Sequence, residues 1–259
     1  MTSTEHLLVY LVLFFYTAAA VCYFIGYRKD LFLKIAFWFS VAGLIANLLA
    51  LISRTSLSGR LPLANGYEFL LSFACITVLM YIIYEIKSDK KNAGGVVMLM
   101  NALLIVTIFL LMSQQIGKSM PLMPALKSPW LTVHVITATA AYSAFTLAAG
   151  LAIIQLRNEV STEDTSIYKI IAMGFAMLSL SIVLGAIWAE QVWGSYWTWD
   201  PKETWALVTW IIYAIYLHLH RQKGWRGNNA RILVIAGFVL VLFTFFGVNY
   251  LLPGLHSYA

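Results

Sequence analysis

The chain has 259 residues, of which 61% are hydrophobic and only 11% are charged. A soluble domain carries about 25% charged residues, so this composition excludes a water-soluble core and indicates an integral membrane protein. Apolar runs of roughly 20 residues predict helices, because the strands of a membrane barrel alternate over only about 10 residues.

The chain carries eight apolar spans, each near the length that a bilayer requires. The first is too long for the core of a signal peptide, and no small-residue cleavage site follows it, so we expect a retained helix. The sequence predicts an all-α fold, a polytopic bundle of about eight transmembrane helices in a single domain over 1–259. The spans cover about 6–27, 31–53, 67–86, 93–112, 131–156, 167–188, 203–220 and 232–252.

Twelve of the 17 lysines and arginines lie at one end of these spans. By the positive-inside rule this end is cytoplasmic, which places both termini outside. The net charge of +6 is then an orientation signal and predicts no nucleic-acid partner. We expect a bacterial plasma membrane, with a thylakoid membrane as the alternative, and a functional face that points outward. Five cations fall on the outer side: Arg54, Arg60, Lys118, Lys127 and Lys202.

Three of the five histidines are expected at the outer side, His6, His134 and His256, and an aromatic segment lies between the last two in sequence. His134 begins the fifth span, His256 follows the eighth, and WGSYWTWDPKETW occupies 193–205. Haem iron accepts two axial imidazoles, its ring packs on aromatic side chains, and the outer cations could pair with its propionates. The alternative is that these residues are amphipathic anchors at the membrane interface.

The aromatic segment combines large rings with a turn. Trp193, Trp197 and Trp199 are interleaved with Gly194 and Ser195. Glycine lets the backbone turn and lets another group approach closely. We interpret the segment as a shelf for a ligand, and an interfacial belt of anchors remains the alternative.

We predict no catalytic residue in the chain. Cys22 and Cys75 lie inside apolar spans without CxxC spacing and are expected to be packing residues. Asp200, Pro201 and Glu203 have the spacing of a capping box before a helix. A proton-transfer role for Asp200 or Glu203 is the lesser interpretation.

Three further titratable residues lie near the ends of predicted helices. His218 and His220 are two residues apart on one helix, so they point in different directions and cannot share a ligand. We expect His218 to face the bundle and His220, next to Arg221, to face the surface. Glu68 opens the third span and is expected to interact with the helix dipole, or to balance a cationic ligand.

Four segments of the chain resemble a known family. WGSYWTWDPKETWALVTWIIYAIYLH resembles the tryptophan-rich WWD signature of haem-handling proteins, and closely that of the CcsA (ResC) family. GVNYLLPGLHSYA, SPWLTVHVITATAAYSAF and ANGYEFLLSF resemble further segments of the same family. The resemblance covers about 65–259.

This resemblance implies a role in cytochrome c maturation by the system II pathway. Such a protein moves haem b to the outer face and presents it for thioether attachment to the CxxCH motifs of apocytochrome c, as a subunit of a holocytochrome c synthase. The resemblance implies His134 and His256 as axial ligands and His218 as a deeper haem ligand. It places the haem platform in 189–205, with Trp193, Gly194, Tyr196, Trp197, Trp199, Asp200 and Trp205.

The resemblance also implies partners. The deep site needs a second histidine, and we expect a separate CcsB (ResB)-like membrane protein to supply it. Thiol-reducing pathway proteins are further possible partners. One alternative is a CcmC-like protein that loads haem on a chaperone. Another is a secondary transporter of a different solute, which would contain inverted repeats with broken helices.

Overall fold

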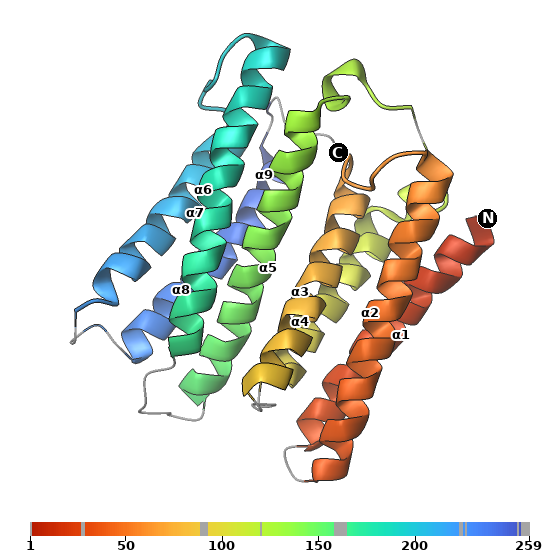
Figure 1. The fold of residues 1–259 in the computed structure, drawn as a ribbon, viewed down its shortest axis with the longest axis vertical. Coiled ribbons are helices and arrows are strands. Elements are labelled where there is room, and N and C mark those ends of the chain that lie inside the picture. The colour runs from red at the N-terminus through yellow and green to blue at the C-terminus, as the bar shows by residue number, and fades with distance from the viewer. Residues whose placement is uncertain are drawn as a thin grey trace. The chain divides into compact units, whose positions relative to one another are not determined.

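The computed structural model describes residues 2–26, 29–88, 93–119, 121–157, 165–222, 225, 227–252 and 254. Helices are the only regular structure in these residues, which confirms the all-α prediction (Figure 1). Seven helices in the described ranges are long and apolar enough to cross a membrane. The contacts divide the chain into two compact units, Met1–Leu122 (unit 1) and Met123–Ala259 (unit 2). The prediction of a single domain stays a prediction.

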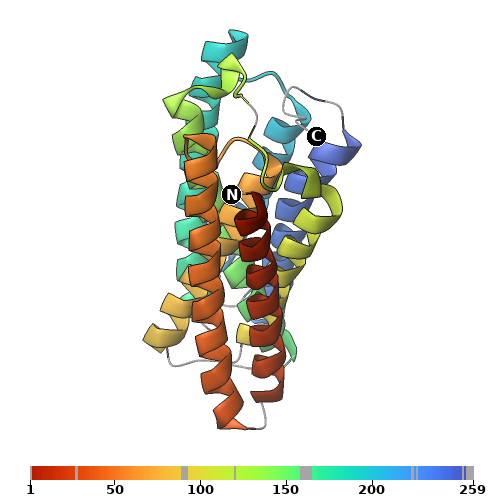
Figure 2. The same ribbon diagram turned by 90° about the vertical axis from the view of Figure 1, so that its right-hand side faces the viewer.

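Unit 1 is a four-helix bundle in which each helix packs on the next and the first also packs along the fourth. Helices α1 and α2 run side by side in both views (Figures 1 and 2). Gly43 of α2 lets them approach closely, since a Cβ there would lie 2.6 Å from the Tyr16 ring. The helices are α1 (Thr2–Gly26), α2 (Asp30–Ser58), α3 (Gly66–Ser88) and α4 (Gly94–Leu111), and the short turn η1 (Ser113–Gln115) follows.

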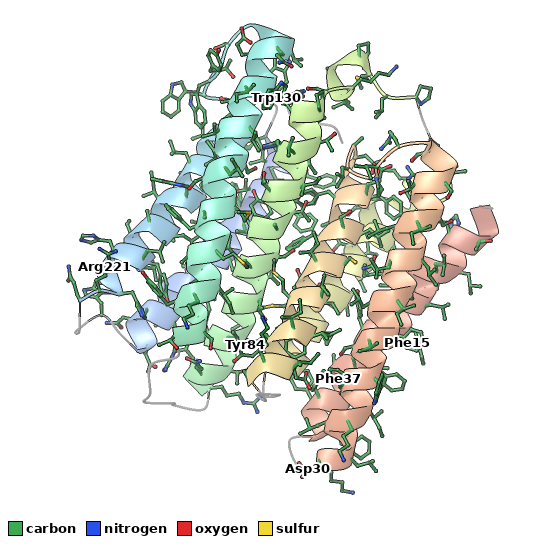
Figure 3. All side chains as sticks on the ribbon, in the orientation of Figure 1. Phe15, Asp30, Phe37, Tyr84, Trp130 and Arg221 are labelled. Atoms are coloured by element: carbon green, nitrogen blue, oxygen red, sulfur yellow. The ribbon has the colours of Figure 1, made fainter. Side chains whose placement is uncertain are left out.

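Unit 2 is built around α5, which packs against α6 and α8, while α7 packs against both of these. The core includes Phe145 of α5 stacked on Tyr213 of α7, with ring centroids 3.7 Å apart. Figure 3 labels Trp130 and Arg221 at opposite ends of this unit. Its elements are η2 (Pro124–Leu126), α5 (Pro129–Arg157), α6 (Thr165–Trp193), α7 (Pro201–Leu219), α8 (Asn228–Leu242), the π-helical turn η4 (Phe243–Gly247) and α9 (Val248–Leu251).

The number of apolar spans differs from the expected eight. Seven of the expected spans correspond to helices that meet the length and hydropathy of a membrane span. The remaining expected span, 203–220, is the seventh in chain order; it forms the helix α7 but is not among these seven helices. Its tryptophan, tyrosine and histidine side chains lower its mean hydropathy, although such side chains are common where a helix meets the membrane interface.

Candidate functional site

His134 lies in the first third of α5 and contacts α6 directly. Its Nδ1 is 2.8 Å from the carbonyl oxygen of Ser181 and 3.1 Å from the Ser181 hydroxyl. A carbonyl oxygen can only accept, so Nδ1 carries the proton and Nε2 carries the lone pair. Gly185 leaves room for the imidazole, because a Cβ at that position would lie 2.8 Å from Nδ1. This is the tautomer and the support that a metal-binding histidine needs.

The tryptophan-rich segment follows directly from the end of α6. Trp188 is buried, donates its indole N–H to the carbonyl of Ala125 at 3.0 Å, and packs edge-on against Trp193. Gly194 then turns the chain with φ of 73°. This left-handed conformation favours glycine, which explains why the motif has a glycine at position 194.

The rings beyond this turn are presented outward. Tyr196 is 61% exposed and Trp199 is 67% exposed, and Trp199 has a positive φ of 60°. Trp197 packs edge-on against Trp199, with ring centroids 5.7 Å apart. The indole nitrogen of Trp197 is buried and has no hydrogen-bond partner in the described part of the chain. A buried unpaired donor is costly, so this nitrogen is suited to an acceptor that arrives from outside.

The capping box at the start of α7 is confirmed. The Asp200 carboxylate accepts from the backbone N–H of Lys202 at 2.9 Å. The Glu203 carboxylate accepts from the N–H groups of Thr198 and Asp200, at 2.8 and 3.2 Å. Both acidic side chains therefore fix the backbone between the exposed rings and the helix.

Trp205 is directed into unit 2. Its ring packs edge-on against Phe243 of η4, with centroids 4.5 Å apart. Its backbone carbonyl accepts from the hydroxyls of Thr209 and Thr244, at 2.8 and 3.3 Å. The last residue of the predicted platform thus joins α7 to the π-helical turn.

The C-terminal segment returns to the beginning of α7. A Cβ on Gly254 would lie 2.5 Å from a carboxylate oxygen of Asp200 and 3.2 Å from the Cδ of Pro201. The Lys202 ammonium donates to the side-chain oxygen of Asn249 in α9 at 3.0 Å. Burial lowers the pKa of Lys202 to about 8, although the nearby Asp200 opposes this shift. His256, two residues beyond Gly254, lies outside the described residues.

The predicted orientations of His218 and His220 are wrong. His218 is exposed, whereas His220 is partly buried and stacks on Tyr168 of α6 with centroids 4.7 Å apart. His220 also contacts Tyr216 one turn earlier in α7. The proximity of His220 to Arg221 suggested a surface position, but packing between α6 and α7 determines which histidine faces inward.

Two of the predicted outer cations are paired inside unit 1. Arg54 is only 1% exposed and donates from Nε to Glu68 at 2.9 Å. Arg60 binds the same carboxylate at 2.8 and 3.1 Å. Glu68 is thus the centre of an ion-pair network, beyond the helix-dipole role expected, and Arg54 is not available to an external ligand. Of the five cations predicted at the outer side, Lys127 and Lys202 belong to unit 2.

Unit 2 defines a class of protein. It is a helical membrane bundle that combines a histidine held by a neighbouring helix with a tryptophan-rich turn. Residues 63–256 match the family described as Cytochrome C assembly protein. A cytochrome c biogenesis protein CcsA from Chlamydomonas reinhardtii is 37% identical over 238 residues, which cover 84% of this chain and 66% of the relative. Two other CcsA proteins, from Mesostigma viride and Trieres chinensis, are 38% and 34% identical, with 78% and 84% of this chain covered and 78% and 85% of the relatives.

The chain therefore belongs to the cytochrome c assembly family and, within it, to the CcsA proteins. The predicted family membership is confirmed. A solved structure of the cytochrome c haem lyase CcmF shares the fold, with a TM-score of 0.71 and 16% identity. That match covers 95% of this chain and 49% of the lyase chain.

Proposed function

We propose that this protein holds haem b at the outer end of unit 2 and presents it for attachment to apocytochrome c. The observation that carries the proposal is the support of His134, whose Nδ1 bonds to Ser181 and whose Nε2 therefore has the lone pair for iron. Family membership supports a role in cytochrome c biogenesis. The distribution of basic residues supports the outward direction.

His134 and His256 serve as the two axial ligands. Gly254 packs against Asp200, so the tail that carries His256 begins beside the tryptophan-rich segment. Exposed Tyr196 and Trp199 pack against the macrocycle, and Trp197 donates its unpaired indole N–H to a polar edge. The cations for the propionates come from Lys127 and Lys202, the two outer-side lysines of this unit.

Attachment adds a cysteine S–H across a vinyl group of the haem, so that sulfur bonds to one carbon and hydrogen to the other. The contribution of this chain is positioning: two imidazoles fix the iron and the rings hold the macrocycle, leaving the vinyl edge accessible. The histidine of the incoming CxxCH motif then replaces one axial ligand, which allows the product to leave.

A second haem position lies deeper in the membrane and uses His218. Because His218 is exposed, it is open to a neighbouring protein. A CcsB-like partner supplies the opposing histidine there. The complex of the two proteins forms the holocytochrome c synthase, in a bacterial plasma membrane or a thylakoid membrane.

The test is the reduced absorption spectrum of the purified chain, with and without a co-expressed CcsB-like partner. We expect a six-coordinate b-type spectrum that is lost in His134→Ala and in His256→Ala and recovered with added imidazole. His6→Ala is the control, since His6 belongs to the other unit. If no preparation contains haem, even with the partner present, the ligand role of these histidines is wrong.

A further inference from the structure

Unit 1 contains a line of buried polar side chains that the haem site does not use. On α1 these are Glu5, Tyr16 and Tyr23, each no more than 3% exposed. On α2 they are Arg54, Asn47 and Ser40, spaced seven residues apart and also buried. A spacing of seven keeps side chains on one face of a helix, so each helix turns a polar stripe toward the other.

The first level of this column is a group of charges. Arg54 lies 3.8 Å from Glu5 and 2.9 Å from Glu68, and Tyr67 donates to Glu5 at 2.8 Å. Arg60 also binds Glu68. Two arginines and two carboxylates balance one another, so this end carries no formal excess charge.

The second level joins α1, α2 and α4. Asn47 donates to the Tyr16 hydroxyl at 3.1 Å. Helices α1 and α4 are antiparallel in register, because Tyr10 stacks on Phe109 and Gly94 packs against Tyr23. This register places the buried Asn101 at the level of Tyr16.

The third level is centred on Glu85 of α3. Tyr23 donates to the Glu85 carboxylate at 2.5 Å, and Tyr81 packs edge-on against Tyr23. Ser40 of α2, which is also buried, donates its hydroxyl to the carbonyl of Ala36 at 2.9 Å. Gly94 of α4 makes room for both tyrosines, because a Cβ there would collide with the Tyr81 hydroxyl and with the Tyr23 ring.

Every level holds at least one buried oxygen without a hydrogen-bond partner in the described residues. All are acceptors on carboxylate or amide groups: Glu5 Oε2, Asn47 Oδ1, Asn101 Oδ1 and Glu85 Oε1. Buried acceptors in proteins are satisfied by a donor, and ordered water is the usual one where protein donors are lacking. No lysine or arginine in the described chain forms an ion pair with Glu85, and an ionisable side chain buried within a membrane span is a functional candidate by default.

The column is long enough to cross the apolar part of a membrane. Glu5 and Tyr23 lie at the two ends of an apolar span of α1. Eighteen residues of helix rise about 27 Å, close to the roughly 30 Å of a hydrocarbon core. The two carboxylates, Glu5 and Glu85, therefore stand near opposite sides of that core.

We propose that unit 1 carries protons along this column. A proton binds to the carboxylate of Glu85 and leaves through water at the hydroxyls of Tyr23 and Tyr16. Water carries it past the amide of Asn47, which gains and loses no proton, to the carboxylate of Glu5. Only O–H bonds break and form, and one proton released at the far end balances each proton bound. Protein and water hydrogen bonds polarise one another in such a chain, which favours transfer.

The experiment uses the full chain in phospholipid vesicles that contain a trapped pH-sensitive dye. A potassium gradient with valinomycin supplies the driving potential. We expect proton uptake above that of protein-free vesicles, and a fall to the protein-free rate in Glu85→Gln and in Glu5→Gln. Asp30→Asn is the matched control, because Asp30 is an exposed carboxylate at the beginning of α2, at the end of the unit where Figure 3 labels it, and Glu85 lies near the end of α3.

Two further variants separate conduction from folding. Glu85→Asp keeps a carboxylate and is expected to keep uptake, whereas Tyr23→Phe removes one hydroxyl and is expected to slow it. The thermal melting of each variant reports whether unit 1 remains folded. Uptake in the unaltered protein no faster than in protein-free vesicles, undiminished uptake in Glu85→Gln, or sodium uptake in place of proton uptake would each overturn the proposal.

Discussion

His134 owes its tautomer to a residue 47 positions away in the sequence. The Ser181 carbonyl holds the Nδ1 proton, and Gly185, one turn further along α6, leaves space for the ring. At this scale the tautomer and the position of the imidazole depend on small groups of α6 as much as on the histidine itself. A substitution that moves the His134 ring without removing it therefore tests whether the position of the imidazole matters.

Gly185→Ala is expected to weaken haem binding at the outer site. The added methyl group would lie 2.8 Å from Nδ1 of His134, so the imidazole must shift away from Ser181. The measurement is the fraction of six-coordinate haem in the purified protein, and added imidazole should restore it. Val183→Ala, on an exposed part of the same helix, is the control. An unchanged spectrum in Gly185→Ala would show that the Ser181 contact does not matter.

Lys202 should make stability depend on alkaline pH. Its folded pKa is lowered to about 8 by burial, so it releases its proton in the folded state while the unfolded lysine still holds one. Unfolding then takes up a proton between about pH 8 and 10, and the free energy of unfolding rises with pH there, by on the order of 1 kcal/mol after allowance for solvent screening.

The measurement is the melting temperature of the unaltered protein and of Lys202→Met across this range. The difference between the two should change in favour of the unaltered protein as the pH rises, because only that protein loses the penalty of a buried charge. A difference that is constant with pH would contradict the lowered pKa.

At the scale of elements, the beginning of α7 connects three parts of unit 2. Asp200 caps the helix, Glu203 holds the preceding backbone, and Gly254 brings the C-terminal segment against the same carboxylate. A cap in an ordinary helix contributes only to stability. Here the cap also sets where the exposed rings end and where the tail begins.

Asp200→Ala is expected to cost about 1 kcal/mol of stability through the lost cap, and to reduce haem retention as well. Asp200→Asn keeps an acceptor for the Lys202 N–H and should retain most of both properties. Thermal melting and haem content, measured on the same samples, distinguish the two effects. Equal haem loss in both variants would instead indicate that the charge of Asp200 matters.

Elements with a strong local signal could be predicted from the sequence. Long apolar runs identified the helices, and the spacing of Asp200, Pro201 and Glu203 identified the capping box. The orientation of His218 and His220 could not be predicted from the sequence, because the Tyr168 ring that stacks on His220 comes from another helix. The pairing of Arg54 with Glu68 was missed for the same reason, since only the packing of α2 on α3 brings them together.

For the whole molecule, the two units have different chemistry. Unit 1 encloses ion pairs and amides along its axis, such as Arg54 with Glu68 and Asn47 with Tyr16. Unit 2 carries the supported histidine and the exposed rings. His134 and His218 both belong to unit 2, so the proposed deeper haem position has to be tested by changes within that unit.

His218→Ala is expected to remove only the haem that depends on a partner. His218 is exposed, so a histidine of a CcsB-like protein can approach it, whereas His134 is supported within its own unit. Co-purified with that partner, the unaltered complex should contain more haem than the chain alone. His218→Ala should abolish this increment and leave the haem held by His134. His134→Ala should remove the haem at the outer site and leave the partner-dependent increment.

His220→Phe is the control for this experiment, because a phenyl ring can keep the stacking on Tyr168 without offering a ligand. Haem content per complex, measured by extraction, and the spectrum after imidazole addition give independent values. If His220→Phe loses the partner-dependent haem and His218→Ala keeps it, the inward-facing histidine is the ligand. The deep site would then lie between α6 and α7, at the stack of His220 on Tyr168, and the partner would have to open that contact.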